Sequence, residues 1–330
     1  MHSRRVHLGV LSIFLGSSAI LGCGRGGSGT AASGGKPRVA VSIFPLWDIV
    51  RRVAGERLEV ILVLPPGRSE HSYDPTPKEM AQVAQAKLGL SVGLGMDGWL
   101  EKVVRGAAGN EVPITQLGPK ANPRKMTAEE VGAEAAEEAA EQKDKPEEHH
   151  EHEHEHEHDH HGAEDPHFWL DPVRMKALVP TIVEVLSKLD APGADGYKTR
   201  GQTVEAELDK LHVLIEAKSK TWTKKTIVTF HGSMGYYAER YGLRIAAVIE
   251  PFPGKEPTAK YVKEVLGAIE KSQAVALFSE PQLDRRPAQV IADQAKLPLF
   301  ELDPIGGGPG ADTYEKLLEK NTTVLDKALR

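Results

Sequence analysis

The chain lacks several features that mark common classes of protein. Among 330 residues it has one cysteine, Cys23, so no disulfide can form within it. Aromatic residues make up 5% of the chain, and no basic cluster with interleaved aromatics occurs, which argues against nucleic acid as a partner. The apolar run at 8–21 is too short to span a bilayer comfortably. No expected helix carries an H-E-x-x-H signature, a common mark of zinc hydrolases.

Residues 1–23 have the pattern of a lipoprotein signal peptide. Arg4 and Arg5 supply positive charge before the apolar run, which ends in the letters ILGC. This ending resembles the bacterial lipobox, in which the cysteine thiol, here that of Cys23, receives a diacylglycerol. The following residues, 24–37, are rich in Gly, Ser and Ala and are expected to form a flexible tether. The arginine pair leaves open whether export follows the general secretory or the twin-arginine route.

A histidine tract, residues 149–161, has the sequence HHEHEHEHEHDHH and holds eight of the fourteen histidines. The wider segment 129–165 contains sixteen acidic residues and two lysines, a net charge of −14, whereas the whole chain carries −6. Imidazole and carboxylate groups suit zinc, copper and nickel, but a low-complexity tract does not pack. We therefore expect auxiliary, weak metal binding by His149, His150, His152, His154, His156, His158, His160 and His161.

Strands and helices are expected to alternate from residue 38 onward, which indicates an α/β fold with mostly parallel sheets flanked by helices. The expected strands are 39–43, 58–64, 88–92, 112–117, 227–230, 245–249, 274–278 and 298–302. The expected helices are 46–54, 77–87, 99–107, 172–189, 194–219, 234–241, 258–271, 287–296 and 314–329. The helix 194–219 would be about 40 Å long, enough to join two lobes.

We accordingly predict an N-terminal lobe at 38–190, a connecting helix within 191–222 and a C-terminal lobe at 223–330. A disordered acidic and His-rich insertion is expected within the first lobe, at 122–164. The metal site is expected in the cleft between the lobes.

Three isolated histidines, His71, His167 and His231, remain outside the tract, the N-terminal segment and the long helix. Each follows an expected strand or lies in a loop that leads out of the sheet. Ligands of open α/β sheets bind beyond the carboxyl ends of the strands. Their shared position therefore favours a binding site over three unrelated polar residues.

The sequence around these histidines resembles the metal-specific solute-binding proteins of ABC transporters, the zinc and manganese group. The similar stretches are PPGRSEHSYDPTP at 65–77, DPHFWLDP at 165–172, FHGSMGYY at 230–237 and LDP at 302–304. The resemblance extends over 36–330 apart from the insertion. It is strongest to zinc-uptake members, which often carry a His-rich insertion at this place.

The resemblance implies four ligands, namely His71, His167, His231 and Asp303. Three imidazoles and one carboxylate suit tetrahedral Zn²⁺. Manganese members have Glu in the third motif, so His231 makes Mn²⁺ the less favoured ion. Glu70 or a water is an alternative fourth ligand, and Glu280 could orient a ligand instead.

The implied function is that of a high-affinity zinc-binding component of an ABC transporter, not an enzyme, which delivers zinc to a membrane permease. We expect a monomer at the extracytoplasmic face of a bacterial cell envelope, held to the membrane by lipid at Cys23. Two alternatives remain open at this point: a zinc-dependent hydrolase with Glu70 as general base, and an extracellular metal buffer or cell-adhesion protein.

Overall fold

The structure is a computed structural model that describes residues 35–132 and 164–330. The expected signal peptide with Cys23 and the histidine tract 149–161 lie outside the described residues. The chain divides into two units, Met1–Gly35 and Lys36–Arg330, and the fold described below is that of the second unit. Within the described residues, no helix combines the length and the apolar character needed to cross a membrane.

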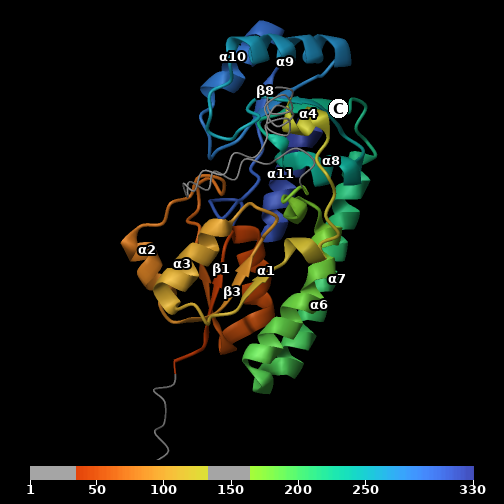
Figure 1. Cartoon of the computed structure of the whole chain (residues 1–330). Coiled ribbons are helices and arrows are strands. Elements are labelled where there is room, and N and C mark those ends of the chain that lie inside the picture. The colour runs from red at the N-terminus through yellow and green to blue at the C-terminus, as the bar shows by residue number, and fades with distance from the viewer. Residues whose placement is uncertain (1–34, 133–163) are drawn as a thin grey trace, which may run out of the picture. The chain divides into compact units, whose positions relative to one another are not determined.

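The first sheet has four parallel strands in the order β2-β1-β3-β4 (Figure 1). Its strands are β1 (Arg38–Val41), β2 (Glu59–Leu62), β3 (Ala86–Ser91) and β4 (Ile114–Gln116). The helices between them are α1 (Phe44–Ala54), α2 (Pro77–Val83) and α3 (Gly98–Ala108). Parallel strands need crossover connections of this kind, so each strand end opens into a loop on the same edge of the sheet.

The second sheet repeats the arrangement with four parallel strands in the order β6-β5-β7-β8. Its strands are β5 (Thr226–Thr229), β6 (Arg244–Val248), β7 (Leu277–Ser279) and β8 (Leu299–Glu301). Its helices are α8 (Gly235–Tyr241), α9 (Ala259–Ser272), α10 (Arg286–Ala295) and α11 (Tyr314–Leu329). The predicted α/β class with two parallel sheets is confirmed.

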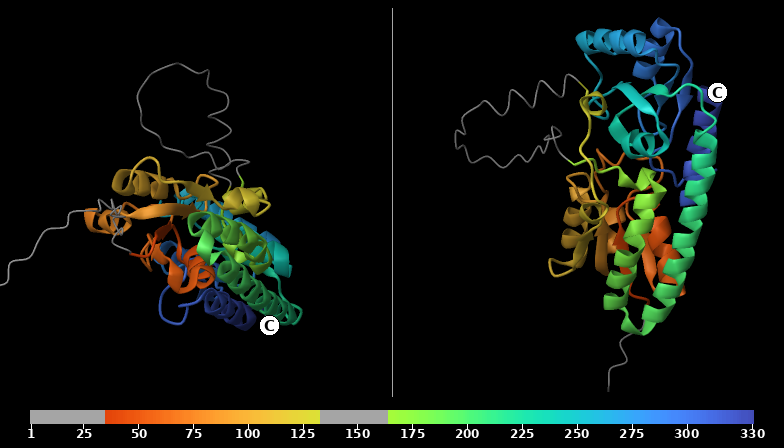
Figure 2. Two further views of the ribbon diagram at one scale, coloured as in Figure 1. Left: turned by 90° about the horizontal axis from the view of Figure 1, so that it is seen from below. Right: turned by 90° about the vertical axis from the view of Figure 1, so that its right-hand side faces the viewer.

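A long helix, α7 (Ala194–Ser219), follows α6 (Pro172–Leu189), and the two helices lie side by side (Figure 2). With 26 residues, α7 is about 39 Å long. It packs against α1 beside the first sheet and against α8 and α11 beside the second. Its buried face has the spacing expected of an amphipathic helix and consists of Tyr197, Gly201, Val204, Leu208, Leu211, Ile215 and Ser219.

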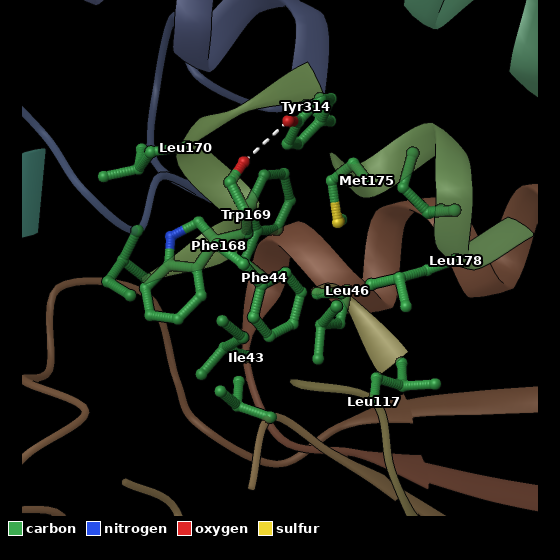
Figure 3. Packing of buried hydrophobic residues seen from close by; sticks show 14 of the residues in the cluster. Ile43, Phe44, Leu46, Leu117, Phe168, Trp169, Leu170, Met175, Leu178 and Tyr314 are labelled. Atoms are coloured by element: carbon green, nitrogen blue, oxygen red, sulfur yellow. Dashed lines mark hydrogen bonds between the residues drawn. The ribbon is translucent and has the colours of Figure 1, made fainter. Parts of the chain in front are cut away.

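One hydrophobic cluster runs through both halves of this unit, since it contains Val39 of β1 and Ile227 of β5. Trp169, which precedes α6, is completely buried in it. The indole of Trp169 donates a hydrogen bond to the carbonyl of Pro304 (2.8 Å). The Tyr314 hydroxyl donates one to the Trp169 carbonyl (2.6 Å) (Figure 3). The two lobes therefore share a core, and relative motion between them has to disturb dense packing.

The segment 122–132 is packed, although it falls in the expected disordered insertion. It contains a short helix, α4 (Ala128–Val131), which contacts β6 of the second sheet. A capping box joins Thr127 to Glu130 and stabilises the start of this helix. Lys125 forms an isolated antiparallel bridge with Glu164, so both described ends of the insertion meet. Residues 122–132 thus differ from the expectation because local capping and tertiary packing outweigh their polar composition.

Candidate metal centre

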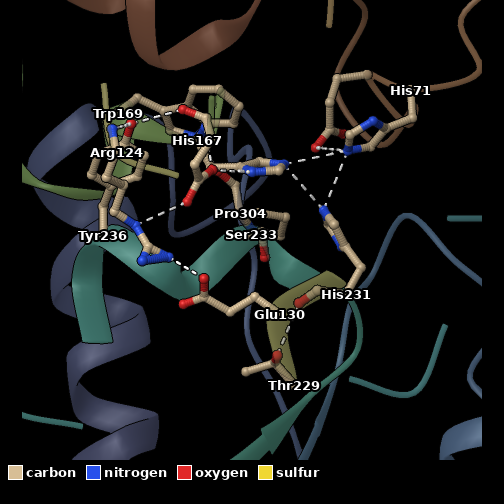
Figure 4. Close-up of polar contacts among 12 residues, drawn as sticks. His71, Arg124, Glu130, His167, Trp169, Thr229, His231, Ser233, Tyr236 and Pro304 are labelled. Atoms are coloured by element: carbon tan, nitrogen blue, oxygen red, sulfur yellow. Dashed lines mark hydrogen bonds and ion pairs between the residues drawn. The ribbon is translucent and has the colours of Figure 1, made fainter. Parts of the chain in front are cut away.

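His71, His167 and His231 converge on one point, although 96 and 64 residues separate them along the chain. His71 follows β2, His231 follows β5, and His167 precedes the 3-10 turn Phe168–Leu170. The distances between their Nε2 atoms are 3.3 Å for His71 and His231, 3.4 Å for His71 and His167, and 3.3 Å for His167 and His231 (Figure 4). The structure therefore brings together the three isolated histidines that the sequence singled out.

The size of this triangle matches a tetrahedral zinc shell. Ligand nitrogens at 2.0–2.1 Å from a tetrahedral ion lie about 3.3–3.4 Å from one another. An ion could reach the triangle from one side. The side chain of His71 is 17% exposed, whereas those of His167 and His231 are 3% and 4% exposed. One edge of the site therefore remains reachable from solvent.

Two buried carboxylates hold the opposite ring nitrogens of the deeper histidines. Asp165 Oδ1 lies 2.8 Å from Nδ1 of His167 and also accepts a hydrogen bond from its backbone N–H (3.0 Å). Glu280 Oε1 lies 2.8 Å from Nδ1 of His231, at ion-pair distance, but the contact lacks the geometry of a hydrogen bond. Such carboxylates fix the tautomer and direction of a metal-binding imidazole, so that Nε2 faces the ion.

Glu70 completes a group of four potential ligands with the three histidines, all of whose ligand atoms lie within 4.8 Å of one another. Its Oε1 lies 3.6 Å from Nε2 of His71, and the residue is 2% exposed. Among the described residues, none donates a hydrogen bond to this oxygen. Burial raises the pKa of Glu70 to about 7, because the charged form loses its hydration. A cation would supply the missing partner.

Asp303 lies outside that group of four in the described part of the chain. It follows β8, and its Oδ1 accepts hydrogen bonds from the backbone N–H groups of Ile305 (3.1 Å) and Gly306 (2.9 Å). The same oxygen accepts a third from the side chain of Gln282 (2.8 Å). The loop thus fixes Asp303 through one of its two carboxylate oxygens, Oδ1.

The electrostatic balance of the site is negative. Burial alone would lower the pKa of His231, but the carboxylates of Glu280, Glu70 and Asp165 together raise it. Burial raises the pKa of Asp165 to about 6, although Arg124 opposes that rise. A divalent cation bound in the site would interact favourably with these carboxylates.

Sequence reasoning did not single out Asp165 or Arg124. Asp165 stands two residues before His167 in the second motif, and this spacing lets one carboxylate oxygen reach both the backbone N–H and the ring of His167. This two-residue spacing could have identified Asp165 from the sequence as a partner of His167. Arg124 lies 41 residues earlier, and only the fold shows its contact with Asp165.

The chain is similar to several known metal-binding proteins. The family model for zinc-uptake complex component A, periplasmic, matches residues 39–328. The high-affinity zinc uptake system protein ZnuA of Brucella abortus (strain 2308) is 32% identical over 96% of this chain and 98% of its own length. The manganese ABC transporter substrate-binding lipoprotein PsaA of Streptococcus anginosus is 26% identical over 96% of each chain. A crystal structure of ZnuA superimposes with a TM-score of 0.72 at 22% identity, covering 90% of this chain and all of the other.

Proposed function

The chain belongs to the family of periplasmic zinc-uptake components of ABC transporters, and on this premise we propose that it captures one Zn²⁺ ion with His71, His167, His231 and Glu70. It is a zinc-binding transport component and not an enzyme, and it works with a membrane permease. Compared with the set that the resemblance implied, Glu70 takes the place of Asp303. The single observation that supports it is the triangle of Nε2 atoms with edges of 3.3–3.4 Å.

The choice of Glu70 over Asp303 rests on their hydrogen bonds. Asp303 Oδ1 already accepts three hydrogen bonds, two of them from its own loop. Glu70 Oε1 is buried beside His71, and no described residue donates a hydrogen bond to it. A buried carboxylate oxygen in this condition is costly unless a cation binds it. Asp303 then serves to fix the loop after β8 beside the ion.

The metal preference follows from this shell of three imidazoles and one carboxylate. Zn²⁺ accepts such a set at tetrahedral geometry, whereas Mn²⁺ prefers more oxygen ligands and stands lowest in the Irving–Williams order. His231 is central to this preference, because it places a nitrogen ligand where the manganese-binding members have the carboxylate oxygen of a Glu. A site with four protein ligands also leaves no open position for a substrate, which disfavours a hydrolase.

The ion would bridge the two lobes, since His71 follows a strand of the first sheet and His231 follows a strand of the second. The shared core and the long helix α7 oppose a wide hinge movement. We propose that zinc binding produces a small adjustment between the lobes, which the permease distinguishes from the zinc-free form.

Location and assembly form part of the same proposal. Lipid on Cys23 would keep the protein at the membrane beside its permease, with 24–37 as the tether and a monomer as the working unit. The tract 149–161 would hold further zinc ions weakly and raise their local supply to the centre.

A calorimetric zinc titration of the full chain tests the ligand assignment. We expect His167→Ala to abolish tight binding of one ion while weak binding by the tract persists. The matched control is His212→Ala, because His212 lies on α7 and faces the Tyr241 hydroxyl (3.3 Å). His212→Ala should bind zinc as the wild type does. Tight binding by His167→Ala would contradict the assignment.

A further inference from the structure

Arg124 lies between two carboxylates that flank residues 133–163 in the sequence. Its Nε donates a hydrogen bond to Asp165 Oδ2 (3.2 Å), and its Nη2 forms a short ion pair with Glu130 Oε2 (Figure 4). Glu239 contributes a third, longer ion pair at 3.7 Å. The Arg124 side chain is only 13% exposed, so these contacts form largely away from water. Such charge-assisted pairs are stronger and more directional than exposed ones.

The backbone around Arg124 is fixed as firmly as its side chain. Its carbonyl accepts a hydrogen bond from the N–H of Asp165 (2.7 Å). Its own N–H donates to the hydroxyl of Tyr236 (3.1 Å), and that hydroxyl donates to the Asp165 carbonyl (2.7 Å). The guanidinium also lies over the Tyr236 ring, 5.3 Å from its centroid. Besides the ion pair, one direct backbone hydrogen bond and two hydrogen bonds through the Tyr236 hydroxyl therefore hold Arg124 against Asp165.

Asp165 divides its two oxygens between Arg124 and His167. Oδ2 accepts from Arg124, and Oδ1 accepts from the backbone and faces Nδ1 of the ring of His167. Asp165 is completely buried. A buried carboxylate keeps its charge at a reasonable cost only when a cation or several donors face it. The guanidinium supplies that charge from the side opposite His167.

We propose that Arg124 is a positioning residue of the metal centre, which holds the side chain of Asp165 in place so that His167 presents Nε2 to zinc. This inference rests on the proposed function, because it takes His167 as a zinc ligand. Residues that hold a ligand in this way typically change metal affinity about 10- to 100-fold when they are lost. Arg124 acts through Asp165, so we expect the lower end of that range for its removal.

A purely structural role for Arg124 is the competing explanation, because Glu130 and Tyr236 also tie it to α4 and α8. Arg174 provides the matched control. Its guanidinium also lies over the Tyr236 ring, 4.6 Å from the ring centroid, and it donates a hydrogen bond to the carbonyl of Ala121. Arg174 pairs with Asp171 and not with Asp165. Arg174→Gln should therefore lower the melting temperature as a structural change does, without altering zinc affinity.

The test measures zinc affinity of the full chain at no more than one ion per chain, together with the ¹⁵N spectrum of the His167 ring in zinc-free protein. We expect Arg124→Gln to weaken zinc binding about tenfold and to broaden or shift the Nδ1–H signal of His167. Arg124→Lys keeps a positive charge beside Asp165 and should recover most of the affinity. Wild-type affinity and an unchanged ring signal in Arg124→Gln would overturn the proposal.

A double-mutant cycle with Asp165→Asn separates an effect of Arg124 through Asp165 from a general structural effect. In the Asp165→Asn protein, Arg124 still pairs with Glu130 but no longer faces a carboxylate that contacts His167. Adding Arg124→Gln to Asp165→Asn should then change zinc affinity less than twofold. A further tenfold loss in the double variant would mean that Arg124 acts by another route. Wild-type affinity in His167→Ala would instead refute the ligand assignment itself, which separates the two failures.

Discussion

Replacing Glu70 by Gln should strengthen the zinc-free fold and weaken zinc binding at the same time. In the structure this carboxylate is buried, and no described residue donates a hydrogen bond to its Oε1. Without metal, the cost of burying its charge exceeds the stabilisation by His231 and by a backbone hydrogen bond. With metal, the same charge is a ligand. The neutral amide of Gln has a similar shape but carries no charge. The substitution should therefore raise the stability of the zinc-free protein and lower its zinc affinity.

The size of the stability effect follows from the pKa of Glu70, which burial raises from 4.5 to about 7. This difference corresponds to at most about 3 kcal/mol for charging Glu70 in the folded protein. Because the pKa is higher in the folded state, that state binds more protons between these values, and stability falls as the pH rises through about 7. The gain from Glu70→Gln should therefore approach 3 kcal/mol near pH 8 and vanish near pH 4, where the group is protonated in both states.

The zinc effect can be set against the total binding free energy of four-ligand zinc sites, about 10–16 kcal/mol. One of four ligands then contributes about 3 kcal/mol, or roughly a 100-fold change in affinity. Urea unfolding of the zinc-free protein at pH 8 and pH 4, with a zinc titration at pH 8, measures both effects. Asp303→Ala is the matched control, because it removes the acceptor of three hydrogen bonds and should lower zinc-free stability. A Glu70→Gln variant that is less stable at pH 8, or that keeps wild-type zinc affinity, would refute the reasoning.

Further predictions address metal choice, pH, the tract and the anchor. Zinc should bind at least tenfold more tightly than manganese in competition calorimetry, and His231→Glu should reduce that ratio; equal affinities in the wild type would contradict the shell of three imidazoles. Zinc affinity should fall below about pH 7 as protons compete for the imidazoles and for Glu70, whose pKa is about 7, and a flat titration from pH 8 to pH 5 would oppose this. Deleting 147–161 should leave one tightly bound zinc ion by metal analysis, whereas loss of that ion would place ligands in the tract. Cys23→Ala should release the protein from the membrane fraction or block its processing, and retention at wild-type levels would argue against lipid anchoring.

The three histidines could be found from sequence because a general rule and local motifs agreed on them. Strand ends of an α/β sheet carry the ligands, and each histidine stands in a distinctive stretch. The parallel sheets followed from the alternation of strands and helices. The strand orders β2-β1-β3-β4 and β6-β5-β7-β8 did not follow, since they depend on contacts between distant segments.

Some helices and strands end at other residues than the sequence predicts, because strand pairing outweighs the local conformational preference of those residues. The helix expected at 77–87 ends at Val83, because Ala86 already pairs with Arg38 of the neighbouring strand. The strand expected at 274–278 is found at Leu277–Ser279, beside β5 and β8. Single-sequence patterns carry no information about such partners, so the ends of elements are decided by the assembled sheet.

The fourth ligand could not be chosen from sequence for a similar reason. Glu70 and Asp303 are both carboxylates beside expected strand ends, and their residue types do not distinguish them. The difference appears in the structure, where backbone N–H groups of the loop after β8 donate to Asp303, whereas Glu70 groups with the ligand atoms of the three histidines. The contact of Arg124 with Asp165 could not be predicted from the sequence either, because the two residues are 41 positions apart.

The most direct test of the central claim is the zinc K-edge X-ray absorption spectrum of the full chain loaded with one zinc ion. The account predicts three imidazole nitrogens at about 2.0–2.1 Å and one carboxylate oxygen, with the imidazole signal reduced in His167→Ala and unchanged in His212→Ala. A shell of four or more imidazoles, or one unaffected by His167→Ala, would place the tight site in the histidine tract and contradict the account.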